Sequence, residues 1–173
     1  MNERPSFRIV PVRTANDLAS TVKLFRAYAS SLEIDLSYQD FEAEMEAMPG
    51  KYAPPAGELL LARYSNGTPV GCVGLRPIDP QGCCEMKRLY VSPEGRGFGL
   101  GERLVEAVVK EAKRIGYREM RLDTLPSMTG AIALYPKIRV RAHRALLRHS
   151  RDRHDFHAPL SHRAFAATER TPA

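Results

Sequence analysis

The chain has 173 residues and a formal net charge of +6, a length that suits one domain with its own hydrophobic core. No apolar run reaches the length of a membrane span, and the polar N-terminus lacks a signal-peptide pattern. We therefore expect a cytoplasmic protein without a membrane partner. An odd number of cysteines without metal-ligand spacing favours reduced, structural thiols over disulfides: Cys72, Cys83 and Cys84.

The hydrophobic pattern predicts a mixed α/β fold with its elements in the order β-α-α-β-β-β-α-β-α. A strand over residues 7–12 precedes two helices over 17–28 and 38–47. Strands over 59–64 and 70–75 flank Asn66 and Gly67, a dipeptide that strongly indicates a hairpin. The remaining predicted elements are a strand over 85–91, a long helix from Gly101, a strand over 118–123 and a helix over 127–135.

A glycine-rich turn at residues 96–101 separates the strand over 85–91 from the long helix, and it says most about function. Glycines let the backbone approach a ligand closely, and N–H groups at a helix start attract phosphate. Arg96 adds a charge-assisted contact. A P-loop is excluded because Glu102 and Arg103 replace its Lys-Ser/Thr, and a dinucleotide fingerprint because the third glycine comes one residue early. The glycines alone leave an ordinary loop as an equal alternative.

The sequence Arg-x-x-Gly-x-Gly after a strand ending Arg-Leu-Tyr-Val resembles the acetyl-CoA diphosphate loop of the GNAT superfamily of N-acetyltransferases. Residues 131–135, Ala-Ile-Ala-Leu-Tyr, are similar to that family's Ala-x-x-Leu-Tyr helix, although Met128 stands where the family often has Asn. The resemblance runs from about Phe7 to Tyr135. It implies a central, mostly antiparallel sheet flanked by helices.

The resemblance also implies acetyl-CoA as cosubstrate, no metal, and an acceptor amine on a small molecule, amino acid or peptide. The end of the strand would pair with the pantetheine arm, mainly through Leu89 and Val91 with Tyr90 between them. The turn would hold the diphosphate through these residues: Arg96, Gly97, Phe98, Gly99, Leu100 and Gly101.

Two residues are candidates for proton transfer. The family pattern makes Tyr135 the acid that protonates the departing thiolate, with a packed core tyrosine as the alternative. Glu85 matches a position where some relatives carry an acid that acts through water. Its equally weighted alternative is a carboxylate paired with Lys87 or Arg88.

Three further residues are candidates for a second base or for the wall of the acceptor pocket. Asp123 ends the strand over 118–123 and would serve as a second base or as an N-terminal cap for the following turn. Tyr28 and Tyr38 lie near the first two helices and are candidates for lining the acceptor pocket.

The composition changes sharply after Ile138. Residues 139–173 hold all five histidines, eight arginines and three acids, and so carry +5 of the formal +6. We expect a transferase domain over 1–138 and an atypical basic tail over 139–173 that replaces the final two strands. A shifted reading frame accounts for this, because codons exist for residues 139–159 that encode a strand-like peptide beginning Gly-Phe when read one nucleotide later.

A nucleic-acid-binding arm is the functional rival for this tail, since arginine-rich segments attract phosphates. However, Phe156 and Phe165 are its only aromatic residues, and its basic residues lack a groove-reading spacing. The pair His154 and His157 lacks the glutamate of a zinc-hydrolase motif. The alternative function is thus a non-catalytic acyl-CoA-binding or nucleic-acid-associated module, and a homodimer is left open.

Overall fold

The computed structural model of the chain describes residues 6–32 and 40–122. The predicted final helix with Tyr135, the residues Tyr38 and Asp123, and the tail from 139 onward lie outside the described residues. In the described ranges, no helix is long and apolar enough to cross a bilayer.

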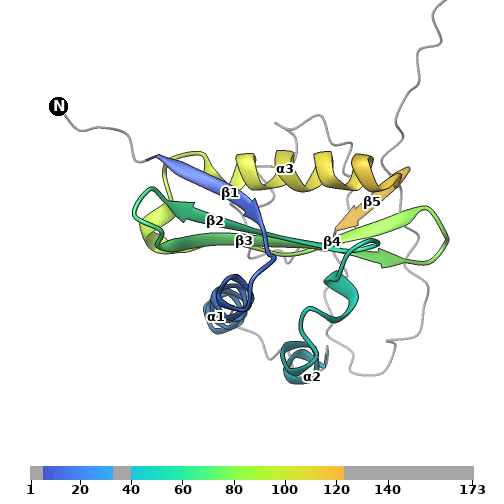
Figure 1. Cartoon of the computed structure of the whole chain (residues 1–173), viewed down its shortest axis with the longest axis horizontal. Helices are drawn as coiled ribbons and strands as arrows, with labels where there is room; N and C mark the ends of the chain where they lie inside the picture. Colours follow the sequence, from blue (N-terminus) through green and yellow to red (C-terminus); the bar gives the residue numbers. More distant parts are fainter. Residues whose placement is uncertain (1–5, 33–39, 123–173) are drawn as a thin grey trace, which may run out of the picture.

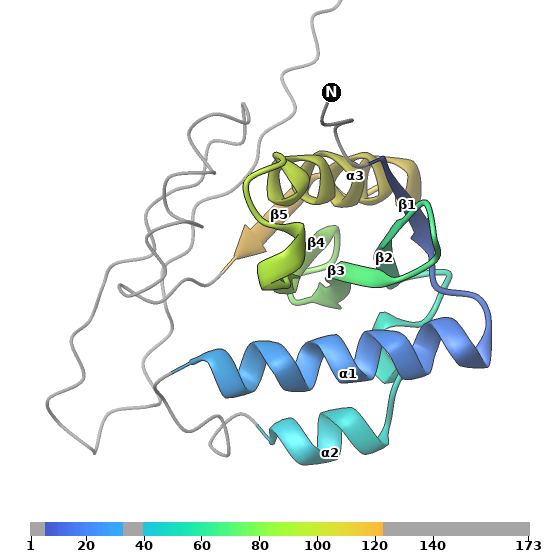
Figure 2. The same cartoon turned by 90° about the vertical axis from the view of Figure 1, so that its left-hand side faces the viewer.

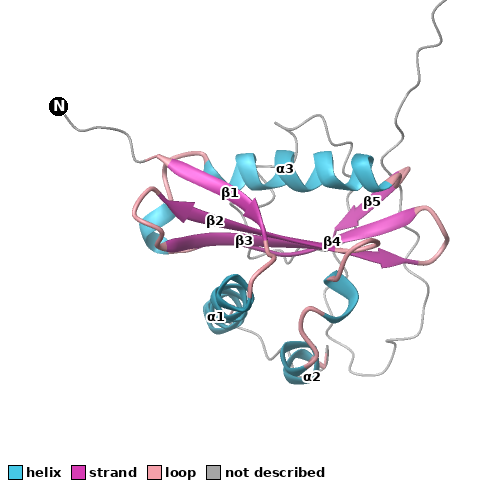
Figure 3. Cartoon of the chain, in the orientation of Figure 1, coloured by secondary structure: helices cyan, strands magenta, loops and turns pink. Residues whose placement is uncertain are grey.

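A five-stranded sheet forms the centre of the molecule, with its strands side by side in chain order (Figures 1 and 3). The first four strands pair antiparallel, and the last two pair parallel. Their bounds are Phe7–Pro11 (β1), Glu58–Tyr64 (β2), Pro69–Ile78 (β3), Cys83–Val91 (β4) and Glu119–Leu122 (β5). The mixed α/β class and the mostly antiparallel sheet predicted from the sequence are confirmed.

Helices cover both faces of the sheet (Figure 2). Ala15–Ser31 (α1) and Phe41–Glu46 (α2) lie on one face, and Leu100–Ile115 (α3) lies on the other. Short 3₁₀ turns cover Gly50–Tyr52 (η2) and Pro93–Gly95 (η3). Two apolar clusters result, one between the sheet and α3 and one between the sheet and α1, α2 and η2.

Local sequence explains where the two long helices begin and end. Thr14 and Asp17 form a reciprocal capping box at the start of α1. Gly99 and Gly116 both adopt the left-handed conformation at the ends of α3. The apolar stripe of α3 is buried against the sheet at Leu100, Leu104, Val105, Val108 and Ala112.

A β-bulge interrupts β4 at Arg88, where the sequence predicted an unbroken strand. Cys72 faces Tyr90, but Gly74 faces Lys87, so one residue of β3 opposes both Arg88 and Leu89. Arg88 itself has φ of 57°, which is uncommon for a residue with a side chain. The alternation of side chains therefore restarts after Arg88, and no propensity in the sequence indicates this.

Candidate functional site

The glycine turn presents bare backbone at the start of α3. Gly97 and Gly99 have φ of 83° and 72°, and a Cβ added at either would meet no atom within 4 Å. Gly99 supplies no side-chain cap, and the first helical bond runs from the Arg103 N–H to the Gly99 carbonyl. Within the described parts of the chain, the N–H groups of residues 100–102 therefore have no acceptor. These donors and the helix dipole favour an anion.

The side chains of the turn lie outside this backbone surface. The exposed Arg96 donates from Nε to the Val91 carbonyl at 3.2 Å, which ties the turn to the end of β4. Phe98 is 46% exposed, and its ring lies 5.8 Å from that of Phe7. The turn thus offers both backbone N–H groups and the Arg96 guanidinium as hydrogen-bond donors.

The last residues of β4 present backbone groups beside the turn. The Ser92 N–H donates to the Val70 carbonyl at 2.9 Å, so by strand alternation Tyr90 also faces β3 through its backbone. The N–H and C=O groups of Leu89 and Val91 then point to the opposite edge. Among the described residues, β5 pairs with β4 only as far as Met86 and does not reach that edge.

Glu85 lies on the sheet face that carries α1 and α2, and only 8% of it is exposed. Its Oε2 accepts from Arg76 Nε at 2.8 Å, and Arg76 Nη2 lies 2.8 Å from the same oxygen. Lys87 Nζ lies 3.5 Å from Oε1. The ion-paired state that the sequence left open is therefore present, with Lys87 as one partner and Arg76, not Arg88, as the other.

Arg88 instead pairs with Glu44 of α2. Arg88 Nη2 lies 3.0 Å from Glu44 Oε2 and Nε lies 3.2 Å from Oε1, and the Arg88 side chain is only 3% exposed. Its guanidinium carbon also lies 5.0 Å from the centre of the Phe41 ring. Burial raises the pKa of the Glu44 carboxyl, but the Arg88 guanidinium outweighs this and holds that pKa below its ordinary value.

Tyr52 completes the group by donating its hydroxyl to Glu44 Oε1 at 2.8 Å. Burial and the Glu44 charge raise the pKa of the Tyr52 hydroxyl well above its usual range, so the phenol acts as a neutral donor. We call these residues the charged cluster: Glu44, Tyr52, Arg76, Glu85, Lys87 and Arg88. No pattern in the sequence indicated Glu44, Tyr52 and Arg76, because they come from separate elements that only the fold brings together.

Tyr28 of α1 packs edge-on against Tyr90 with ring centres 6.2 Å apart, on the same sheet face as the charged cluster. This places one of the two tyrosines suggested for the acceptor pocket beside β4. Its neighbour in the prediction, Tyr38, lies outside the described residues.

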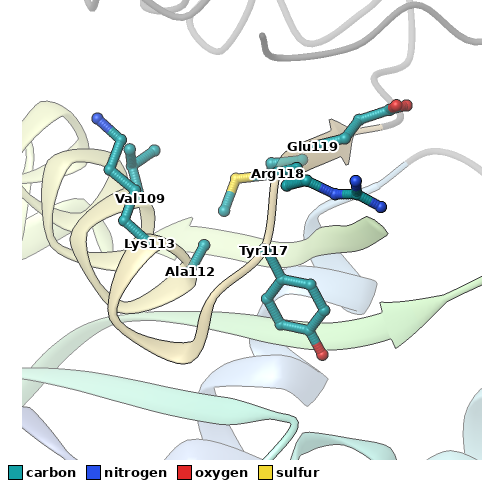
Figure 4. Close-up of a pocket in the computed structure, with 7 residues that line it drawn as sticks. Val109, Ala112, Lys113, Tyr117, Arg118 and Glu119 are labelled. Carbon is teal, nitrogen blue, oxygen red and sulfur yellow. The ribbon is translucent and has the colours of Figure 1, made fainter. Parts of the chain in front are cut away.

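Two cavities lie away from the turn. One of about 170 Å³ is lined by Tyr52 and by the Arg13–Glu58 ion pair, whose atoms approach to 2.6 Å. The other, of about 20 Å³, lies between the end of α3 and β5 (Figure 4). Val109, Ala112, Tyr117 and Met120 supply its apolar wall. Neither of these two cavities includes the turn or the end of β4.

The three cysteines are free and buried. Burial raises the pKa of Cys84 to about 12, which makes its thiol a poor nucleophile. This agrees with the structural role predicted for them. Among the described residues, no group of three His, Cys, Asp or Glu side chains is placed to hold a metal ion.

Comparison with known proteins shows the family to which the chain is similar. The sequence profile of the Acetyltransferase (GNAT) family matches residues 20–139. An uncharacterized N-acetyltransferase of Schizosaccharomyces pombe is 39% identical over 135 residues, which cover 78% of this chain and 83% of that protein. A second uncharacterized N-acetyltransferase, from Dictyostelium discoideum, is 30% identical, and the match covers 73% of this chain and 87% of that protein. The crystal structure of a GNAT-family acetyltransferase from Staphylococcus aureus superposes with a TM-score of 0.67 at 18% identity, over 80% of this chain and 85% of that one.

Proposed function

Because this chain belongs to the GNAT family of acetyltransferases, whose members transfer an acyl group from acyl-CoA to an amine, we propose that it uses acetyl-CoA to acetylate a primary amine. The acceptor is a small molecule, an amino acid or a peptide. The single observation that carries the proposal is the set of N–H groups at the start of α3 that have no acceptor within residues 6–32 and 40–122, beside the side of β4 that faces away from β3.

Acetyl-CoA would bind along these two backbone surfaces. The amides of residues 97–101 would hold the diphosphate, with Arg96 at their flank. The backbone of Leu89 and Val91 would pair with the pantetheine arm, and an N–H group of this edge would stabilise the oxyanion that forms when the amine attacks the thioester carbonyl. The geometry supports this arrangement because the turn and the strand edge are joined by the Arg96–Val91 hydrogen bond.

Calorimetry with acetyl-CoA and with CoA tests the proposal directly. We expect micromolar affinity for both ligands, and thiol release when a suitable amine is added. A chain that binds neither ligand would contradict the proposal. Binding without thiol release from any amine would leave the non-catalytic alternative.

Proton transfer would involve Glu85 and Tyr135. The attacking amine must lose a proton, and Glu85 would accept it through a water molecule. The pairing with Arg76 and Lys87 holds the Glu85 carboxylate on the sheet face that carries α1 and α2, where we propose that the acceptor binds. Tyr135 would protonate the departing thiolate. No step in this scheme needs a metal.

A Glu85→Gln variant should lower kcat by about 100-fold or more, the usual contribution of a general base. Its affinity for acetyl-CoA should not change, because Glu85 lies on the opposite sheet face from α3. Thiol release measures the first quantity and calorimetry the second. Glu119→Gln is the matched control: Glu119 pairs with Arg121 on β5 at 2.6 Å, and in the described part of the chain no ion pair or hydrogen bond joins its side chain to the charged cluster. Equal kcat values for the two variants would remove Glu85 as the base.

A cytoplasmic location follows from the same proposal. Three free, buried thiols support a reducing compartment, where disulfides rarely persist.

We also propose that the tail from residue 139 results from a shifted reading frame. The family profile ends its match at residue 139, where the composition changes. Sequencing the encoding DNA tests this, and an intact frame without an inserted or deleted base near codon 138 would refute it.

A further inference from the structure

The charged cluster contains one more cation than it has carboxylates. Glu44 is engaged by Arg88 through two contacts, and Glu85 by Arg76 through two contacts of 2.8 Å. Lys87 is the remaining cation. Its closest carboxylate oxygen is Glu85 Oε1 at 3.5 Å, on a group that Arg76 already binds more closely.

Lys87 is also largely withdrawn from water, with 14% of its side chain exposed. An ammonium group has three donors, and its burial costs free energy unless those donors are paired. Within residues 6–32 and 40–122, Lys87 makes one long ion pair and no hydrogen bond. The position therefore favours an additional anion, which the described part of the protein does not supply.

Lys87 lies in β4 close to the residues proposed for the reaction, so an anion bound to it would lie near the reacting groups. Lys87 and Glu85 lie on the same face of the strand, about 7 Å apart along it. Their charged ends approach to 3.5 Å. Lys87 also directly precedes the bulge at Arg88, after which Leu89 begins the backbone edge proposed for the thioester. An acceptor whose amine reaches the water held by Glu85 thus has Lys87 within reach of its neighbouring atoms.

We propose that Lys87 binds a carboxylate of the acceptor, so that the substrates are amino acids or similar compact amines that carry an acid. This inference rests on the proposed acetyltransferase function and names its substrate class. The excess positive charge at Lys87 disfavours diamines and polyamines by like-charge repulsion. The same positive charge favours the neutral form of the acceptor amine, which is the form that attacks the thioester.

Matched acceptors test this in the full-length chain with saturating acetyl-CoA. The set consists of an amino acid, its primary amide and the corresponding decarboxylated amine, offered across several side chains. The wild type should prefer the acid to the amide by about tenfold or more in kcat/KM, the effect of one charge-assisted contact. Lys87→Met should abolish the preference by raising KM for the acid, so that kcat/KM falls about tenfold further for the acid than for the amide.

Two variants separate recognition from folding. Lys87→Arg keeps the charge and should retain most of the preference for the acid. Lys110→Met removes an exposed lysine of α3, which lies on the opposite face of the sheet. It should leave kcat/KM unchanged for both the acid and the amide. Equal use of acid and amide by the wild type would overturn the inference. An equal loss for both acceptors in Lys87→Met would also overturn it, because Lys87 would then only support Glu85.

Failure of the proposed function gives a different result. In that case calorimetry shows no affinity for acetyl-CoA or CoA. If CoA binds but no amine is acetylated, titration of the same acids and amides into the CoA complex measures acceptor binding alone. Tighter binding of the acid that is lost in Lys87→Met supports the inference, and equal binding of acid and amide refutes it.

Discussion

A Gly99→Val variant is expected to lose about tenfold or more in acetyl-CoA affinity. The valine Cβ would project into space that no protein atom occupies within 4 Å, which is where we place the diphosphate. A β-branched residue also disfavours the φ of 72° that turns the Gly99 backbone toward this space. The added side chain would block access to the N–H groups at the start of α3, and the disfavoured φ would change their orientation. Calorimetry with CoA measures the loss.

A valine at residue 99 also strains the backbone, and a substitution at Gly67 serves as the control for that strain. It has φ of 88° in the β2–β3 hairpin, and its Cβ would likewise meet nothing within 4 Å. Gly67→Val should therefore cost a similar free energy of unfolding, about 1–3 kcal/mol, without changing CoA affinity. If the two variants bind CoA equally well, the turn does not hold the diphosphate.

Loss of the Arg88 guanidinium should have the largest effect on stability. Arg88→Met is expected to lower the free energy of unfolding by about 3–5 kcal/mol, because it leaves the Glu44 carboxylate in the interior without its cation. Among the residues that the structure describes, Tyr52 would then be the remaining hydrogen-bond donor to Glu44. Urea denaturation at neutral pH measures the change.

An exposed ion pair serves as the control for Arg88. Arg26 lies 2.9 Å from Glu42, but the two side chains are 47% and 69% exposed. Arg26→Met should cost less than about 1 kcal/mol, since solvent screens such pairs. If both substitutions cost the same, the Arg88–Glu44 pair does not stabilise the packing of α2 on the sheet.

Acid pH gives a second check on the same pair. The pKa of Glu44 is lowered on folding from its ordinary value of 4.5, so Glu44 adds stability above that pH. This contribution is lost as the pH falls through the lower folded-state value. Because Arg88 is what lowers that pKa, Arg88→Met should reduce the part of the acid-induced loss that comes from Glu44.

Local patterns in the sequence accounted for most of the elements. The Asn66-Gly67 dipeptide predicted the β2–β3 hairpin, and the 3.6-residue spacing of apolar side chains predicted α3. Each signal lies within a few residues, so it needs no knowledge of distant contacts. Boundaries were less accurate: β3 runs to Ile78, three residues beyond its predicted end, because it continues to pair with β4.

Some parts of the candidate site could likewise be predicted from local sequence, and others could not. The turn at residues 96–101 is readable from its glycines, since a backbone that must adopt positive φ requires them locally. The pairs Glu44–Arg88 and Arg76–Glu85 are not readable, because their members lie on different elements. Sequence neighbours pointed to Lys87 and Arg88 as partners of Glu85, and only Lys87 lies beside it.

The sequence by itself determined the order of the elements over residues 6–122, the glycine turn and the family, because these depend on local backbone preferences and on motifs of a few residues. Only the tertiary structure decided that β4 bulges at Arg88 and that, within residues 6–32 and 40–122, Lys87 has one distant carboxylate partner. The ion pairs of the charged cluster depend on which charges meet across the sheet, α2 and η2. Coulombic attraction and desolvation act through space, so the order of residues along the chain does not contain them.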